Sequence, residues 1–137
     1  MVDNSWVTQI EENVKTYIES RLEDDSILVT SDNFTGDTAS FPAVYVHELS
    51  QSEVGYTIEG NDICGVRTTF QLDVYTNDYN ECKDISKNVM LFMKELRFEV
   101  IASPLHTQEN GYYRSVSRYR RVVGGGDSEL ITDNGQG

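Results

Sequence analysis

The chemistry that this chain can offer is concentrated in one segment, YYRSVSRYRRVV, at residues 112–123. The segment holds four of the eleven Lys and Arg residues of the protein, interleaved with three tyrosines. Guanidinium groups bind carboxylates and phosphates through paired hydrogen bonds. Arg and Tyr are also enriched where proteins contact one another. The four arginines are Arg114, Arg118, Arg120 and Arg121.

Residue types in this segment alternate as they do along a β-strand. The alternation predicts one face with Tyr113, Ser115, Ser117, Tyr119 and Arg121, and another with Arg114, Val116, Arg118 and Arg120. The arginines could pair with acids of the same sheet, contact another subunit or partner, or bind nucleic acid beside stacking tyrosines. We predict an assembly interface formed by Arg114, Arg118, Tyr119, Arg120, Arg121 and Tyr113.

The net charge of −12 argues against nucleic-acid binding by general attraction, because phosphate contacts need clustered cations. Residues 1–111 carry 7 basic and 20 acidic residues, a balance of −13, whereas residues 112–126 carry +4 and residues 127–137 carry −3. A basic strand on an acidic body complements the acidic surface of a second copy of the chain. This arrangement favours rings in which the copies associate head to tail.

Other residues with reactive side chains are not spaced for catalysis. His47 and Glu48 are adjacent, and adjacent strand residues point to opposite faces, so they form no dyad. His106 stands alone in a predicted loop. Cys64 and Cys82 have 17 residues between them, which is not a zinc-binding spacing. We therefore predict no catalytic residue, no cofactor site and no metal site, and a protein that is not an enzyme.

Two further segments also fail the tests for a ligand site. The acidic run at residues 23–25 lacks the spacing of an EF-hand loop and is expected to end a helix. The Gly-rich segment at residues 122–127 follows a strand but precedes no helical pattern, as a phosphate-binding loop would. It is interpreted as a flexible tether.

The elements that must position the arginine segment can be predicted from periodicity. Apolar residues recur at every third or fourth position in residues 5–23 and 77–97, which predicts two amphipathic helices. Asn4 or Ser5 is the expected cap of the first helix. Asp78, three residues before Glu81, is the expected cap of the second.

Strands are predicted at residues 26–30, 41–49, 66–76 and 112–123, with a strand or irregular segment and an Asn110–Gly111 turn within 98–111. Pro104 is expected to interrupt that segment, and residues 50–65 are expected to form a long hairpin loop. The alternation in 66–76 is typical of an antiparallel sheet with one packed face and one face in water. The element order predicts an α+β two-layer sandwich, with a mostly antiparallel sheet of four to five strands and two helices on one face.

Residues 1–123 are predicted to form a single domain, followed by a Gly-rich C-terminal tail or arm at residues 124–137. No run reaches the roughly 18 apolar residues of a membrane helix. The N-terminal residues lack the pattern of a signal peptide, so we expect a cytoplasmic site of synthesis and no membrane.

In the order of its segments and their residue types, the chain resembles the small tail-terminator proteins of long-tailed bacteriophages. These are also called tail-completion or head–tail joining proteins. An amphipathic helix (SWVTQIEENVKTYIESRL) and a short strand precede an aromatic-proline strand (FPAVYV). A long loop then leads to an alternating strand (VRTTFQLDVYT), a helix (YNECKDISKNVMLFMKEL) and a Tyr/Arg-rich strand (ENGYYRSVSRYRRVV). The resemblance covers about residues 4–123.

The resemblance implies a structural virion protein that needs no cofactor and has no catalytic activity. Such proteins form homo-oligomeric rings, hexamers in this family, at the head-proximal end of the tail tube. The ring ends tube polymerisation and joins the tail to the head–tail connector or neck protein. Genomic DNA passes through its lumen without specific binding. The implied location is the tail or neck of the virion, after assembly in the bacterial host cytoplasm.

Other functions remain open from the sequence. The acidic body also suits a DNA-mimic inhibitor of a nucleic-acid enzyme, which would carry carboxylates spaced like phosphates along one face. Another small phage neck or minor capsid protein would have a similar order of segments and similar residue types. A small hydrolase would require His47 or His106 to meet an acid or a nucleophile in a pocket.

Overall fold

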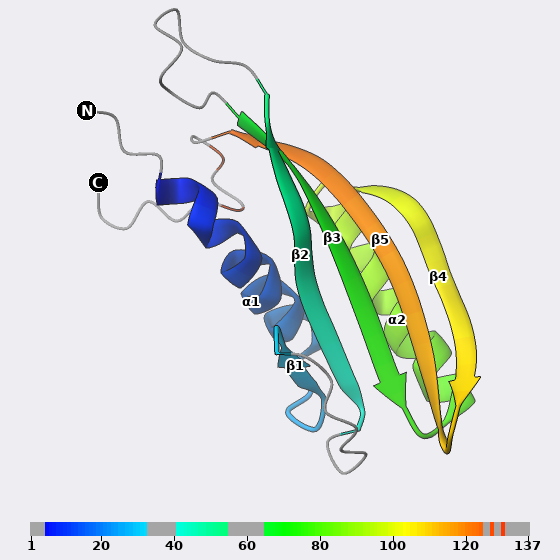
Figure 1. The fold of residues 1–137 in the computed structure, drawn as a ribbon. Coiled ribbons are helices and arrows are strands. Elements are labelled where there is room, and N and C mark those ends of the chain that lie inside the picture. The colour runs from blue at the N-terminus through cyan, green and yellow to red at the C-terminus, as the bar shows by residue number, and fades with distance from the viewer. Residues whose placement is uncertain (1–4, 33–40, 55–64, 125–126, 128–129, 131–137) are drawn as a thin grey trace, which may run out of the picture.

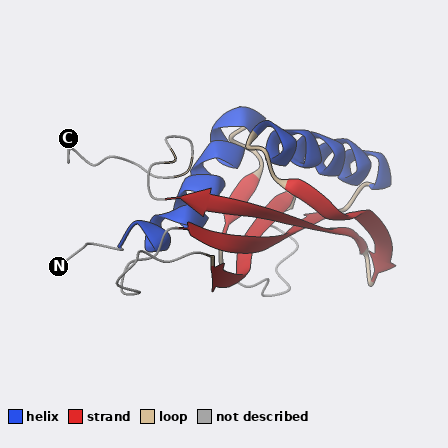
Figure 2. Ribbon diagram, turned by 90° about the horizontal axis from the view of Figure 1, so that it is seen from above, coloured by secondary structure: helices blue, strands red, loops and turns tan. Residues whose placement is uncertain are grey.

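Two helices cover one face of a five-stranded sheet in the computed structural model of the protein (Figures 1 and 2). The structure describes residues 5–32, 41–54, 65–124, 127 and 130. The elements are η1 (Ser5–Gln9), α1 (Ile10–Leu22), β1 (Leu28–Thr30), β2 (Ala43–Glu53), β3 (Gly65–Thr76), α2 (Tyr79–Glu95), β4 (Glu99–Glu109) and β5 (Tyr112–Gly124).

The strands pair in the order β1-β2-β3-β5-β4. Only β1 runs parallel to its neighbour β2, and the other three pairings are antiparallel. The structure therefore confirms the predicted α+β two-layer sandwich with two helices on one face of a mostly antiparallel sheet. The central position of β3 and β5 places the arginine segment in the middle of the sheet, between β3 and the edge strand β4.

The main core lies between the helices and the sheet. The buried stripe of α1 consists of Ile10, Val14 and Ile18. The stripe of α2 includes Cys82, Val89 and Met93, and burial raises the pKa of the Cys82 thiol. These side chains meet the helix-facing residues of β3, which are Val66, Thr68, Phe70, Leu72 and Val74. The helix stripes and the pleat of β3 are thus as predicted.

The helix starts differ in how they are capped. Asp78 caps α2 as predicted, because its carboxylate accepts a 3.0 Å hydrogen bond from the backbone N–H of Glu81. The cap predicted for the first helix is wrong. A 3₁₀ turn at Ser5–Gln9 precedes α1, and Gln9 occupies the cap position without a side-chain hydrogen bond. Asn4 lies outside the described residues.

The hairpin of β4 and β5 contains the predicted Asn110–Gly111 turn, and Gly111 adopts a φ of +83°, which a residue without Cβ reaches easily. Pro104 does not interrupt the strand as expected. It lies within β4, between the paired residues Ala102 and Leu105, where the register shifts. An edge strand tolerates this because one side of it donates to no neighbour.

The strands on both sides of the predicted loop at 50–65 are longer than expected. β2 continues to Glu53 and β3 begins at Gly65, and the N–H of Val54 bonds to the carbonyl of Gly65 at 2.8 Å. Residues 55–64, including Cys64, lie outside the described residues.

We call the sheet face opposite the helices the open face. It is not exposed to solvent along its whole length. A second apolar cluster covers its end where β2 begins and β3 ends. Ala43, Tyr45 and Tyr75 are buried there, and Phe41 and Tyr112 pack against them. The expectation of one fully solvated face is therefore wrong at this end, because aromatic side chains from adjacent strands cover one another.

The structure describes three residues of the predicted tail or arm at 124–137: Gly124 ends β5, and Asp127 and Leu130 contact the domain. Leu130 is fully buried and belongs to the main core. Its carbonyl accepts a 2.6 Å hydrogen bond from Nδ2 of Asn13 in α1, and its N–H donates to Oδ1 of Asp127 at 3.1 Å. Leu130 therefore packs with the core of the domain.

Candidate assembly surface on the open sheet face

The pleat of β5 divides its arginines between the two faces of the sheet, as the alternation predicts. Arg114, Arg118 and Arg120 lie on the open face, opposite Tyr75, Gln71 and Thr69 of β3. Arg121 lies on the helix-facing side, opposite the buried Thr68.

Two residues of the predicted interface are structural instead. Tyr119 is fully buried, and its hydroxyl donates a 2.8 Å hydrogen bond to Oγ of Ser117. Burial raises the pKa of Tyr119. Arg121 has a nearly buried guanidinium that donates to the carbonyl of Leu96 at 2.8 Å and forms an ion pair with Asp127. Tyr119 cannot lie on a contact surface, because it is part of the interior of the subunit. The guanidinium of Arg121 is held by partners within the subunit.

Tyr113 is half-buried beside α2. Its ring lies 5.5 Å from the ring of Tyr79, measured between centroids. It faces the helix layer and not the open face, because it pairs with the buried Thr76 of β3. The predicted interface is therefore reduced, on the open face, to the three remaining arginines of β5.

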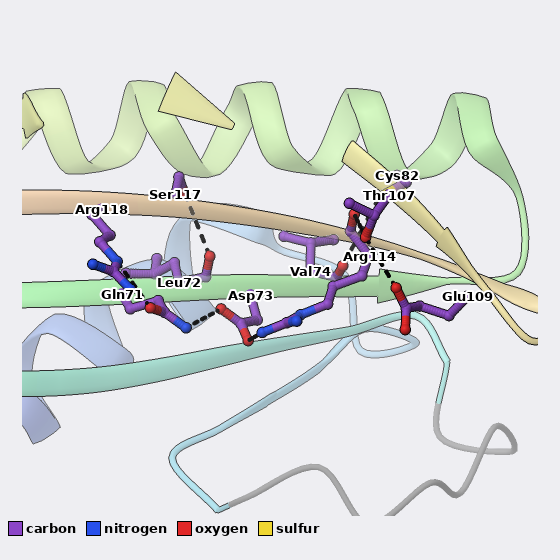
Figure 3. A network of polar contacts seen from close by, with 10 residues as sticks. All are labelled: Gln71, Leu72, Asp73, Val74, Cys82, Thr107, Glu109, Arg114, Ser117 and Arg118. Carbon is purple, nitrogen blue, oxygen red and sulfur yellow. Dashed lines mark hydrogen bonds and ion pairs between the residues drawn. The ribbon is translucent and has the colours of Figure 1, made fainter. Parts of the chain in front are cut away.

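Arg114 belongs to a polar network within the sheet (Figure 3). One of its guanidinium nitrogens, Nη2, lies 2.9 Å from Oδ2 of Asp73, whose side chain is only 7% exposed. The amide of Gln71 donates to Oδ1 of the same carboxylate at 3.0 Å. The guanidinium carbon of Arg114 also lies 5.8 Å from the ring centroid of Tyr75. Arg114 thus compensates the negative charge of the buried Asp73 carboxylate. It is therefore only partly available to contact another molecule.

Arg118 and Arg120 are more exposed, and their partners are exchangeable. Nε of Arg118 donates to Oε1 of Gln71 at 3.0 Å. Nη2 of Arg120 lies 2.9 Å from Oε1 of Glu99, and the two side chains are 43% and 64% exposed. Such exposed pairs contribute little to stability, so a carboxylate of another molecule can replace either partner at low cost.

A cleft of about 390 Å³ adjoins these arginines at the end of the sheet where β3 begins and β5 ends. It is lined by Arg67, Arg97, Glu99, Arg120, Arg121 and Val122. Sequence reasoning missed Arg67 and Arg97 as members of the site. The strand alternation does place Arg67 on the open face, but Arg97 reaches the cleft from the α2–β4 connection with a φ of +66° that no pattern indicates. We call Arg67, Arg118 and Arg120 the basic strip.

The histidines and acids do not come together. His47 lies on the open face with its ring 6.2 Å from that of Tyr45, while Glu48 faces the helices and accepts a hydrogen bond from Thr68. His106 lies beside Tyr79, and burial, followed by the charge of Lys83, lowers its pKa. Across the described ranges, no three His, Cys, Asp or Glu side chains gather closely enough to hold a metal ion.

Comparison with known proteins does not identify the chain. It matches no protein-family model, and no curated protein is significantly similar to it in sequence. Within the described residues, neither helix combines the length and the apolar character needed to cross a membrane.

Proposed function

We propose that this protein is a structural virion component of the tail-terminator type. Copies of the chain assemble into a ring at the head-proximal end of a phage tail tube. The ring ends tube polymerisation and presents a surface to the head–tail connector or neck protein. The observation that carries the proposal is the basic strip on the open sheet face of a chain whose net charge is −12.

A ring built from identical subunits needs two different, mutually complementary patches on each subunit. The basic strip supplies one of them. Arg118 and Arg120 hold only exposed partners within the sheet, and Arg67 makes no ion pair among the residues that the structure describes. Acidic groups are plentiful elsewhere on the chain, so the second patch can come from the body of the next copy.

The acidic body also suits a conduit for DNA. Six copies bring on the order of −70 charges to one ring, and a negative wall repels phosphate instead of gripping it. In this proposal the DNA passes through the lumen without a specific contact. The protein acts by shape and by association, so the function requires no cofactor and no catalytic group.

The proposal is tested by the mass of the purified full-length protein in solution at low and high salt, measured by light scattering, with negative-stain images of the same samples. We expect closed rings that loosen as salt rises, because screening weakens charge-driven contacts. The protein is also added to polymerising tail-tube subunits encoded by the same genome. We expect shorter tubes that carry a ring at one end.

A protein that stays monomeric in both salts and leaves tube length unchanged contradicts the proposal. In that event a DNA-mimic inhibitor is the better hypothesis. Competition with duplex DNA for a nucleic-acid enzyme then provides the deciding assay.

A further inference from the structure

A cleft lined by arginines and a turn of three consecutive acids lie at opposite ends of the sheet. The arginine-lined cleft lies at the end where Arg67 pairs with Val122. The turn between α1 and β1, which contains Glu23, Asp24 and Asp25, lies at the other end. Leu28 pairs there with Ala43, which in turn pairs with Tyr75. Arg67 and Tyr75 are eight positions apart in β3, which corresponds to a distance of about 27 Å along an extended strand. Figure 1 shows the start of β3 at the top and the α1–β1 turn below.

Two of the arginines that line the cleft, Arg121 and Arg97, make contacts within the subunit. Arg121 is held there by the carbonyl of Leu96 and by Asp127, so its guanidinium has a defined position. Arg97 lies 3.8 Å from the same Asp127 carboxylate. Arg67 and Arg120 form the side of the cleft that belongs to the open face, and among the described residues Glu99 is the acid that lines it. Arg67 forms no ion pair among the described residues, and the pair of Arg120 with Glu99 is exposed, so these two guanidinium groups are suited to bind a carboxylate of another molecule through paired hydrogen bonds.

The acidic turn is also well defined. Glu23 adopts a left-handed conformation with a φ of 52° and ends α1. Asp24 accepts hydrogen bonds from the N–H and the hydroxyl of Ser26 at 2.9 and 2.6 Å, which fixes the turn. All three acidic side chains are exposed, and none of them forms an ion pair within the described part of the chain. The turn therefore presents consecutive carboxylates without a local cation.

We propose that the acidic turn Glu23–Asp25 of one copy binds in the arginine-lined cleft of the next copy. The inference rests on the proposed ring and names the two patches that close it. Because the patches lie at opposite ends of the sheet, one subunit can engage two neighbours at once, and repetition of this contact gives a head-to-tail ring.

The test uses a pair of full-length variants with exchanged charges. The first variant, Glu23→Lys/Asp25→Lys, has a basic turn and a basic cleft, and it leaves Asp24 to hold the turn. The second variant, Arg67→Glu/Arg120→Glu, has an acidic turn and an acidic cleft. We expect each variant alone to need at least about a tenfold higher concentration than the wild type for ring formation, because like charges meet at every contact. We expect an equimolar mixture of the two to assemble near the wild-type concentration.

Lys87→Glu/Lys94→Glu is the matched control for the Arg67→Glu/Arg120→Glu variant, because it makes the same change in net charge on the exposed surface of α2. It should assemble like the wild type. Far-ultraviolet circular dichroism and the urea midpoint of each variant show whether the subunit stays folded. Sedimentation of the mixture with one variant fluorescently labelled shows whether both enter the same ring.

The outcomes separate this inference from the proposed function. If the wild type forms rings and both variants form them equally well, the pairing is wrong while the ring remains. If each variant fails and the mixture is not restored, the cleft and the turn meet different partners, which also overturns the pairing. If the wild type forms no ring in solution or on tail tubes, the proposed function itself fails.

Discussion

Arg114 of β5 and Asp73 of β3 form a 2.9 Å ion pair on the sheet face that the helices leave open. The two residues are 41 positions apart in the sequence and belong to neighbouring strands of the sheet. The Asp73 side chain is 7% exposed and that of Arg114 is 35% exposed. A carboxylate this buried requires a charge partner, so the contact between β3 and β5 depends at this point on the presence of Arg114.

Replacement of Arg114 by Ala should therefore destabilise the monomer by about 2 kcal/mol, because it leaves the buried Asp73 carboxylate without its cation. Removal of Arg118, which donates a hydrogen bond to the amide oxygen of Gln71, should cost less than about 1 kcal/mol. Urea unfolding of Arg114→Ala and Arg118→Ala in parallel measures the difference. Equal midpoints for the two variants would show that Asp73 does not depend on Arg114.

The different roles of Arg114, Arg118 and Arg121 show which features of the sheet can be predicted from the sequence and which cannot. Alternation in residues 112–123 suffices to separate Arg121 from the open-face arginines, because the pleat is a local property of the chain. It cannot tell Arg114 from Arg118, since the difference lies in the β3 residue that each one reaches, which is Asp73 for Arg114 and Gln71 for Arg118. That register depends on pairing between distant segments.

The C-terminal segment gave no signal for a related reason. Leu130 and Ile131 are the only two apolar residues in the stretch 124–137, so no period exists from which burial could be inferred. The backbone of Leu130 is bound by Asn13, which is distant in the sequence, and by Asp127, which is close to it. The helices, by contrast, could be predicted because each carries several turns of an apolar stripe.

Leu130→Ala should lower the free energy of unfolding by roughly 2–4 kcal/mol, as expected when a fully buried leucine is truncated. Leu91→Ala is the matched control, because Leu91 is 42% exposed on α2 and loses little burial. Both variants are compared with the wild type by urea unfolding. If Leu130→Ala is as stable as the control, the segment around Leu130 does not belong to the folded core.

The raised pKa of Glu48 predicts that the stability of the protein depends on pH. Burial raises the pKa of this carboxyl, although hydrogen bonds from Thr68 and Gln51 act in the opposite direction. Because the pKa is higher in the folded than in the unfolded state, the folded protein retains the Glu48 proton over a window in which the unfolded chain releases it. The contribution of Glu48 to stability therefore declines as pH rises from the ordinary carboxyl pKa through the raised pKa, and stays unfavourable above it.

Glu48→Gln removes this titration and keeps an oxygen that accepts from Thr68 and Gln51. We expect the variant to have a higher urea midpoint than the wild type at pH 7, and the difference to vanish near pH 3, where both states of the wild type hold the proton. Unfolding curves across this range measure the effect. A variant that is less stable than the wild type at pH 7 would show that the hydrogen bonds of the charged form outweigh its burial.

Charge reversal at the two exposed arginines of β5 tests whether the open face is an assembly surface. Arg118→Glu/Arg120→Glu should abolish ring formation, because it turns an attraction for acidic neighbours into repulsion. The monomer should stay folded, with a free energy of unfolding within about 1 kcal/mol of the wild type, since the exposed contacts with Gln71 and Glu99 contribute little.

Arg118→Lys/Arg120→Lys keeps the charge but loses the paired hydrogen bonds of guanidinium, so it should form rings that dissociate at lower salt than the wild type. Light scattering and negative-stain images at several salt concentrations distinguish the three proteins. Normal rings from the Glu variant would mean that these arginines serve only as a solvated face of the sheet.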